Sequence, residues 1–311
     1  MTARQAQSVT VGGIEVGLSR TDKDLFPADG ITKGDLVGYY QDLAGRMLPY
    51  LAGRPLVMAR YPDGITGQRL FQKNVPGYFP DWITRTEVAK QDGSLHHVVC
   101  DKPATLVYLA NQACIEMHIF TSRIGRLDRP DQVVFDLDPP DADHFGEARR
   151  AALELRDLLE GELDLTAFVK TTGGKGLHVH VALRAEEDFG QVRGFARQAS
   201  AVLAARNPDL VTLEQRRDSR ASRIYADVMR NAYAQTVVAP YSVRARPGAP
   251  VAVPLHWEEL DGDTEPGMLT LRTVRRWLDR PGRGDPWAGL TRHRYGLARA
   301  AGRLSKLDGA G

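Results

Sequence analysis

The sequence contains little cysteine and no long apolar segment. Its 311 residues include only two cysteines, Cys100 and Cys114, too few for a disulfide framework or a zinc site of four thiolates. Both have apolar neighbours, so we expect reduced thiols in the core of a cytoplasmic protein. No apolar run approaches the roughly 20 residues of a membrane helix, and the polar start lacks a signal-peptide segment. These absences argue against a membrane protein and against secretion.

The sequence also lacks an excess of charge of either sign. Its 41 basic and 39 acidic side chains leave a formal charge of +2, a balance typical of folded globular proteins. Basic residues are nevertheless concentrated in residues 271–306, where ten Lys or Arg face only two acids. Such a face can bind polyanions, although it is often only a solvated helix surface. A second basic cluster contains Arg216, Arg217, Arg220 and Arg223.

Internal repeats, low-complexity tracts and long linkers are absent, which favours a single domain over about residues 1–300. Apolar periodicity predicts helices over residues 32–51, 103–117, 147–163, 189–207, 271–277 and 295–304, with a loop at 261–267. Short β-rich runs predict strands over residues 56–61, 97–100, 132–137, 167–170, 177–183 and 237–238. The mixture indicates an α+β fold.

Two aspartates lie side by side at the end of an apolar run. A strand here would place Val133, Phe135 and Leu137 on one face and Asp136 and Asp138 on the other. Carboxylates held this close repel each other, and a divalent cation is the simplest compensation. Oxygen ligands suit Mg²⁺ or Mn²⁺, and the two prolines that follow would leave the strand end open. The alternative is a pair of acids at a strand edge that faces water.

A glycine-rich turn, KTTGGKG at residues 170–176, comes later in the chain. Glycines allow backbone N–H groups to point into one concavity, and such nests bind phosphate. Lys175 would add a positive charge and the Thr172 hydroxyl a donor. The segment is not a Walker A loop, because the GxxxxGK[ST] spacing is missing and a strand is expected to follow. A plain glycine hairpin between two strands is the alternative.

Histidines and a third acid extend this set. His178 and His180 share one face of the strand after the turn, and a zinc pair is conceivable. No third nitrogen or sulfur ligand is evident, so we favour a histidine that donates to phosphate. Asp227 ends another apolar run and could complete a site for two metal ions. The alternative is that Asp227 forms a salt bridge with Arg223 or Arg230.

These elements, in this order, resemble the polymerase domain of bacterial LigD, a non-homologous end-joining enzyme of the archaeo-eukaryotic primase superfamily. The segments are FDLDPP at 135–140, KTTGGKGLHVHV at 170–181, YADVMRN at 225–231 and APYSVR at 239–244. The likeness begins with LSRTDKDLFP at 18–27 and continues to about residue 277. The resemblance implies two facing mixed or antiparallel sheets flanked by helices. It also implies an N-terminal module over about residues 1–60, a catalytic core over about 61–260 and basic C-terminal helices over about 268–306.

The resemblance also implies a set of site residues. Asp136, Asp138 and Asp227 would be catalytic ligands of two Mn²⁺ or Mg²⁺ ions, with nucleoside triphosphates as substrates. Around the incoming nucleotide it places His118, Thr172, Gly173, Gly174, Lys175, His178, Arg220 and Arg244. Phe71 matches an aromatic residue that stacks on a base, and Lys73 lies in the same DNA-binding segment. Lys23 and Lys33 match a basic pair that holds a 5′-phosphate.

The sequence departs from the family pattern at three positions. Leu70 stands where a second aromatic is common, Ala59 where Lys is common, and Thr172 replaces Ser but keeps the hydroxyl. Two KxDG strings, at 90–93 and 306–309, match the nucleophile motif of nucleotidyl-lysine ligases. We interpret both as coincidences, because the chain is too short to hold a ligase domain beside the polymerase. The expected form is a stand-alone primase-polymerase or a polymerase fragment.

The favoured function is a template-dependent nucleotidyltransferase that extends 3′-hydroxyls in gapped or broken duplex DNA with a 5′-phosphate and prefers ribonucleotides. A separate DNA ligase and an end-binding protein are expected partners. One alternative is a haloacid-dehalogenase phosphatase, whose first motif also reads strand-DxD. That class requires a Thr or Val soon after the second Asp and a later GDxxxD pair, which this sequence lacks. The other alternative is a non-catalytic module that binds DNA ends.

Overall fold

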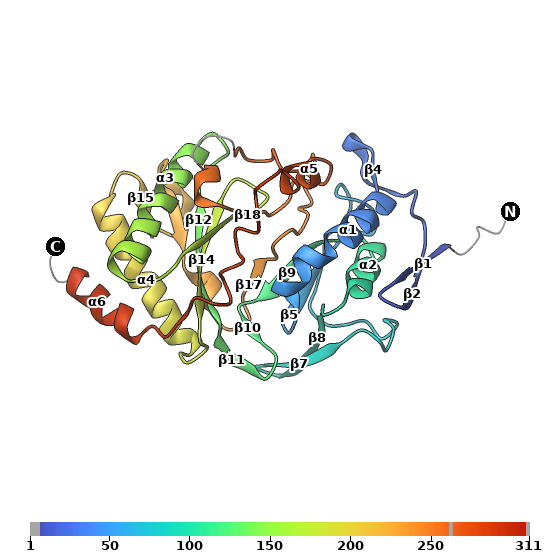
Figure 1. The fold of residues 1–311 in the computed structure, drawn as a ribbon, viewed down its shortest axis with the longest axis horizontal. Helices are drawn as coiled ribbons and strands as arrows, with labels where there is room; N and C mark the ends of the chain where they lie inside the picture. Colours follow the sequence, from blue (N-terminus) through green and yellow to red (C-terminus); the bar gives the residue numbers. More distant parts are fainter. Residues whose placement is uncertain (1–6, 261–263, 309–311) are drawn as a thin grey trace.

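The N-terminal sheet lies on one side of the computed structural model, which describes residues 7–260 and 264–308 (Figure 1). Its strand order is β17-β9-β5-β8-β7, with β6 paired to β5, and all these pairings are antiparallel. Its strands are β5 (Pro55–Arg60), β6 (Leu70–Gln72), β7 (Arg85–Lys90), β8 (Gly93–Val99), β9 (Cys114–Phe120) and β17 (Thr236–Val238). Helices α1 (Lys33–Leu51) and α2 (Pro103–Asn111) pack against each other, and α2 contacts β9.

The C-terminal sheet has the order β15-β16-β12-β14-β13-β18, with β19 beside β14. Its strands are β12 (Gln132–Asp138), β13 (Phe168–Thr171), β14 (Leu177–Leu183), β15 (Val211–Thr212), β16 (Ile224–Asp227), β18 (Pro254–Leu255) and β19 (Arg294–Tyr295). Helices α3 (Phe145–Arg156) and α4 (Phe189–Arg206) cover its outer face (Figure 1). The predicted α+β fold with two sheets is therefore confirmed.

Smaller elements complete the chain. The strand pairs are β1 (Gln7–Val11) with β2 (Ile14–Leu18), β3 (Asp24–Phe26) with β4 (Ile31–Thr32), and β10 (Ser122–Arg123) with β11 (Arg126–Pro130). The C-terminal helices are α5 (Val274–Leu278) and α6 (Ala298–Asp308). Single turns of helix are η1 (Pro27–Asp29), η3 (Arg217–Ser219), η4 (Met229–Asn231) and η5 (Trp257–Leu260), and the π-helix η2 (Asp157–Glu162) extends α3. In the described residues, no helix is both long and apolar enough to cross a membrane.

Helix α1 shows how local sequence and packing agree. The Thr32 hydroxyl accepts from the Asp35 N–H, and the Asp35 carboxylate accepts from the Thr32 N–H, which fixes the predicted start. Tyr40, on the buried side, donates its hydroxyl to the Ile115 carbonyl at 2.7 Å. The same hydroxyl accepts from the Val243 N–H at 3.0 Å. The helix thus holds β9 against the segment that precedes Arg244.

One predicted helix is wrong in its second half. The interval 103–117 contains α2 only as far as Asn111, and β9 begins at Cys114. Ala113 adopts a left-handed conformation with φ of 55°, which ends the helix. After that point, the apolar residues Ile115, Met117 and Ile119 alternate with the period of a strand, and the chain follows this period and not the helical one.

Other boundaries shift by smaller amounts. The predicted helix 271–277 is confined to α5, and the predicted helix 295–304 begins three residues later, after β19. Part of the predicted loop 261–267, residues 261–263, lies outside the described residues. Cys100 and Cys114 are buried free thiols, as predicted. The first KxDG string forms the hairpin turn between β7 and β8, where Lys90 pairs with Gly93.

Candidate active site

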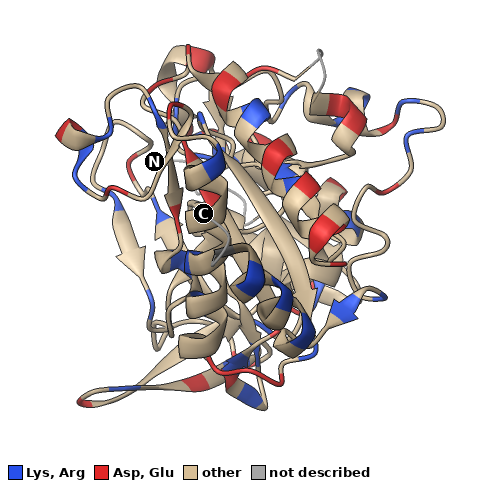
Figure 2. Ribbon diagram, turned by 90° about the vertical axis from the view of Figure 1, so that its left-hand side faces the viewer, with Lys and Arg blue, Asp and Glu red and all other residues tan. Residues whose placement is uncertain are grey.

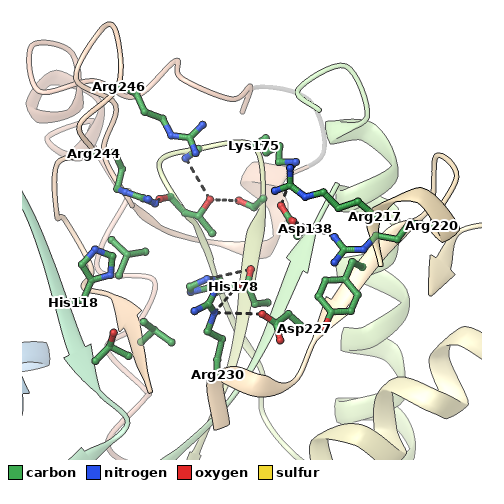
Figure 3. A pocket seen from close by; sticks show the side chains of 18 residues that line it. His118, Asp138, Lys175, His178, Arg217, Arg220, Asp227, Arg230, Arg244 and Arg246 are labelled. Atoms are coloured by element: carbon green, nitrogen blue, oxygen red, sulfur yellow. Dashed lines mark hydrogen bonds and ion pairs between the residues drawn. The ribbon is translucent and has the colours of Figure 1, made fainter. Parts of the chain in front are cut away.

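Three acids that are distant in sequence meet on neighbouring strands. Strand β12 lies between β14 and β16, and Asp136 stands directly opposite Asp227 on β16 and His178 on β14. Directly opposed residues of antiparallel strands share one face of a sheet. Asp138, two residues along β12, lies on the same face, while Leu137 between them is fully buried on the other. The three carboxylates open into one cleft of about 330 Å³ (Figure 3).

Cationic side chains compensate these carboxylates. The Arg230 Nε lies 3.1 Å from Asp136 Oδ2 and 3.6 Å from Asp227 Oδ2, so one guanidinium bridges two acids. The alternative salt bridge of Asp227 with Arg230 is therefore present. On the other acid, Lys175 Nζ and an Arg220 nitrogen approach the two Asp138 oxygens at 3.5 and 3.7 Å. The bridge proposed to Arg223 is absent, because that guanidinium donates to the carbonyls of Pro208, Ser219 and Arg220.

Two of the acids differ in their protonation chemistry. Burial opposes the charge of Asp136, but His178 and Arg230 outweigh it and hold the pKa of Asp136 below its usual range. Burial and the charge of Asp136 raise the pKa of Asp227, although the Met229 N–H and Arg230 oppose this. Burial and the charge of Lys170 lower the pKa of His178 to about 4, so this ring is neutral at pH 7. Asp136 therefore keeps its negative charge to a lower pH than Asp227.

The donors present suit a hard divalent cation. Three carboxylates on adjacent strands, with proline-bounded access at the end of β12, are the oxygen ligands that Mg²⁺ and Mn²⁺ prefer. Among the described residues, however, no three His, Cys, Asp or Glu side chains are close enough together to form a metal-binding cluster. Instead, the positively charged guanidinium of Arg230 forms ion pairs with Asp136 and Asp227. Arg230 would have to move for these two acids to share an ion.

The glycine turn joins β13 to β14, and hydrogen bonds of one of its own side chains close it. Thr172 Oγ1 donates to the Gly176 carbonyl at 3.0 Å and accepts from the Gly174 N–H at 3.3 Å. Gly173 has a φ of 66°, and a Cβ there would lie 2.7 Å from Arg244 Cγ. A Cβ on Gly176 would lie 2.6 Å from the Leu137 carbonyl oxygen. The predicted hairpin is thus also the wall of the cleft, and only glycine fits where it meets β12.

The opposite wall comes from the N-terminal sheet. His118 on β9 and the backbone of β17 line the cleft, and Arg244 reaches in from the segment after β17. Glu116, two residues before His118, accepts from His118 Nε2 and Arg244 Nε, both at 3.1 Å. It also accepts from the Ala245 N–H at 3.0 Å. Burial alone would raise the pKa of Glu116, but these donors hold it below its usual range.

The structure brings most of the predicted nucleotide-binding residues together. The cleft is lined by His118, Thr172, Gly174, Lys175, His178, Arg220 and Arg244, whereas Gly173 lies behind the turn. His180 does not line the cleft: its Nδ1 pairs with Gln132, and its ring lies 4.9 Å from that of Trp287. The lining residues that the predicted site set did not include are Gly176, Arg217, Tyr225, Arg230, Thr236, Val237, Val238 and Arg246. The signal for Arg230 was its place three residues after Asp227 beside a turn.

The predicted DNA-binding residues lie outside the cleft, on the N-terminal side. Phe71 is 47% exposed, its ring lies 5.8 Å from that of His118, and Arg69 covers it at 4.8 Å. Lys33 is buried, and burial together with the charges of Arg20 and Lys23 lowers its pKa to about 8. These three cations therefore lie close together.

Five of the ten cations in the basic C-terminal run form ion pairs with other parts of the domain. In the described residues, Arg275 pairs with Asp42, Arg280 and Arg283 pair with Glu259, and Arg299 and Arg303 pair with Asp164. Arg283 is also buried. These pairs hold the last helices against the body of the domain, which leaves fewer free cations there than the sequence indicated.

Comparisons with known proteins agree with this geometry. The family model of the LigD primase-polymerase domain matches residues 32–287. The bifunctional end-joining protein LigD of Bacillus subtilis is 34% identical over 254 residues, covering 81% of this chain and 41% of that protein. The multifunctional LigD of Pseudomonas aeruginosa is 33% identical over 302 residues, covering 96% of this chain and 35% of that protein. The chain thus spans about two fifths or less of these relatives.

A solved structure shows the same fold. The polymerase domain of Mycobacterium tuberculosis ligase D, in complex with DNA, aligns with a TM-score of 0.82 and 31% identity. The alignment covers 90% of this chain and 99% of that one. This leaves no support for the haloacid-dehalogenase alternative. The chain belongs to the LigD primase-polymerase family, and it is therefore a nucleotidyltransferase domain.

Proposed function

We propose that this domain fills gaps and extends broken ends of duplex DNA by adding nucleotides to a primer 3′-hydroxyl as a template directs. The supporting observation is that Asp136, Asp138 and Asp227 share one cleft with a wall of arginines, lysine and histidine. Acids suit metal-bound phosphate chemistry, and cations suit a triphosphate. The DNA named with the M. tuberculosis relative supports the choice of partner.

The cationic wall would bind and orient the triphosphate. Lys175, Arg244 and His118 approach the cleft from three separate segments, so they could contact several phosphate oxygens at once. When the primer oxygen bonds to the α-phosphorus, the bond to pyrophosphate breaks and negative charge grows on the leaving oxygens. Fixed cations stabilise that charge without reorganisation.

The three aspartates would hold two divalent ions, Mn²⁺ or Mg²⁺. Bound ions of this kind supply Lewis acidity to the primer hydroxyl and to the phosphate oxygens. Strand β12 fixes the separation of Asp136 and Asp138, and Asp227 lies beside them on β16. Arg230 neutralises Asp136 and Asp227 until an ion replaces it.

The N-terminal side would hold the DNA beyond the cleft. Phe71 offers an exposed ring for stacking on a base, a contact worth roughly 1–3 kcal/mol. Lys33 and Arg20, with Lys23, which also pairs with Asp63 at 2.8 Å, form a cationic site suited to a 5′-phosphate across the gap. Preference for ribonucleotides is part of the proposal through the family resemblance, and competition between ribo- and deoxyribonucleotides would test it.

Primer extension on a gapped duplex with Mn²⁺ tests the proposal. We expect Asp136→Ala and Asp227→Ala to abolish extension, while Asp128→Ala, at a side chain 77% exposed and outside the cleft, extends like the parent. Equal extension by the parent and either cleft variant would refute the metal-ligand assignment. A parent that binds DNA ends but incorporates no nucleotide would instead support the non-catalytic alternative.

A further inference from the structure

A second groove lies beside the active-site cleft and has no role in the function described so far. It runs between α4 and the β16–η4 segment and has a volume of about 460 Å³. Arg193 and Arg197 line it from the helix, and Gln215, Tyr225 and Met229 from the other side. The groove is open along the helix, because a Cβ built on Gly194 meets no atom within 4 Å.

The charge of the groove is positive. No acid lines it, and in the part of the chain that the structure describes, neither Arg193 nor Arg197 forms an ion pair. Arg206 on the same helix, by contrast, pairs with Glu162. Helix α4 contains no acid, and Figure 2 shows Lys and Arg gathered on the helices at the lower centre of this face. Residues four apart project from one helix face, so both guanidiniums can contact one polyanion.

The groove begins where the cleft ends. Tyr225 lines both, and the Arg220 guanidinium lies 3.8 Å from the centre of its ring. Met229, at the groove, donates its N–H to Asp227 Oδ1 at 2.8 Å. The cleft and the groove therefore adjoin at Tyr225 and the β16–η4 segment, at the edge of the sheet.

The order of the strands gives the cleft a direction. The glycine turn and Lys175 lie at β13–β14, and Asp227 lies on β16, on the far side of β12. In-line transfer requires the attacking hydroxyl and the leaving pyrophosphate to be on opposite sides of the α-phosphorus. If the pyrophosphate lies at the glycine turn, the primer 3′-hydroxyl approaches from β16, and its strand extends past β16 toward α4.

We propose that this groove, lined by Arg193 and Arg197, binds the phosphodiester backbone of the primer strand upstream of its 3′-hydroxyl. The proposal rests on the proposed function, because the direction of the primer follows from in-line nucleotidyl transfer. It assigns to α4 a role in primer binding that is separate from the 5′-phosphate side at Lys23 and Lys33. Nucleic acid is favoured as the occupant because the arginines lack acidic partners and the groove continues the cleft.

The test compares Arg193→Ala/Arg197→Ala with Arg126→Ala/Arg150→Ala. The control pair removes the same charge from exposed positions outside both cavities. Fluorescence anisotropy measures the affinity of each protein for primer-templates whose primers extend upstream to different lengths, at several salt concentrations. For two lost phosphate contacts, the slope of log K against log salt should become shallower by about 2 in the groove variant.

We expect the parent and the control to gain affinity as the primer lengthens, and the groove variant to lose that gain while its KM for nucleotide stays unchanged. Unchanged length dependence and salt slope in the groove variant would overturn the proposal. Loss of affinity only for substrates with a single-stranded template extension would also overturn it, because the groove would then hold the template. A parent that shows the groove effect but extends no primer would contradict the proposed function alone.

Discussion

At the scale of single residues, the carboxylate of Glu116 organises the cationic wall. It is buried behind His118 and Arg244, which line a cleft that would bind an anion, and it carries negative charge. Its oxygens fix the direction of Arg244 and one nitrogen of His118, and Arg69 lies 3.6 Å away beside Phe71. We therefore regard Glu116 as a positioning residue that connects the base side of the site to the triphosphate side.

We expect Glu116→Ala to destabilise the domain by about 3 kcal/mol, because it leaves buried donors without an acceptor. It should also raise the KM for nucleotide, since the direction of Arg244 is lost. Glu116→Gln keeps an acceptor and should recover most of both losses. Denaturant unfolding and steady-state kinetics of the two variants provide the measurement. Equal KM values for the alanine variant and the parent would contradict the positioning role.

The pH dependence of the domain's stability should reflect the ionisation of Glu116. The pKa of Glu116 is lower in the folded state than the value of about 4.3 in an unfolded chain. Its contribution is therefore present above that unfolded value and is lost as pH falls toward the folded one. Unfolding at pH 5 and pH 3.5 should show a smaller loss of stability for Glu116→Gln than for the parent. A parallel loss in both proteins would contradict this.

Arg230 occupies the position where an ion would link Asp136 and Asp227. We expect Arg230→Gln to lower the stability of the ion-free protein by about 1 kcal/mol, since the like charges lose their bridge. Addition of Mn²⁺ should then raise the Tm more in the variant than in the parent, because the ion no longer displaces a guanidinium. Thermal unfolding with and without Mn²⁺ measures both effects. An equal Mn²⁺ shift in the two proteins would contradict the competition.

The sequence predicted which residues lie together where strand geometry alone decides their placement. Alternation put Asp136 and Asp138 on one face, and the glycine run located the turn. Glu116, and the contact of Arg230 with Asp136, were missed because they depend on which strand lies opposite which, a register that no local pattern contains. From the residues alone, Asp227 could be a metal ligand or an ion-pair partner of Arg230. Only the family resemblance favoured the metal-ligand role.

At the scale of elements, the β13–β14 hairpin shows how packing limits sequence. Its Gly176 passes so close to the end of β12 that an added Cβ would lie 2.6 Å from the Leu137 carbonyl oxygen. That carbonyl belongs to the residue of β12 that lies between the two aspartates. The hairpin and β12 therefore cannot shift independently.

We expect Gly176→Ala to destabilise the domain by about 1–3 kcal/mol and to reduce extension, because either β12 or the turn that holds Lys175 must move. The matched control is Gly45→Ala, on the exposed side of α1, where an added Cβ meets nothing within 4 Å. Alanine in an exposed helix should stabilise that variant by up to about 1 kcal/mol. Unfolding curves of the two variants give the comparison, and similar stability for both would contradict the close approach.

Elements with a strong local signal were predicted well, and those decided by backbone conformation were not. Helices α1 and α4 have capping boxes that can be read directly from Thr32 with Asp35 and from Asp188 with Gln191. The end of α2 depends on the left-handed conformation of Ala113, which alanine rarely adopts and no pattern indicates. The strand β9 that follows carries His118, so this error also hid which sheet supplies that wall.

At the scale of the whole molecule, the domain presents two cationic regions in addition to the α4 groove. One is the cationic wall of the cleft, where we propose that the triphosphate binds, and the other lies in the N-terminal segment around Lys33. Most of the C-terminal arginines are used in internal ion pairs, so the charge available to DNA is confined to fewer places than the composition indicated. DNA with a gap would span both regions only if its 5′-phosphate lies at the N-terminal one.

The last prediction concerns recognition of that phosphate. Burial and two neighbouring cations lower the pKa of Lys33 to about 8, so its charge is present at pH 7 and lost above pH 8. We expect the parent to prefer gaps with a 5′-phosphate over gaps with a 5′-hydroxyl, by a ratio that decreases from pH 7 to pH 9. Lys33→Ala should remove most of this preference, and Lys306→Ala, on the exposed side of α6, should not. Binding of the two gapped duplexes at each pH measures the ratio, and a preference that survives in Lys33→Ala would place the phosphate elsewhere.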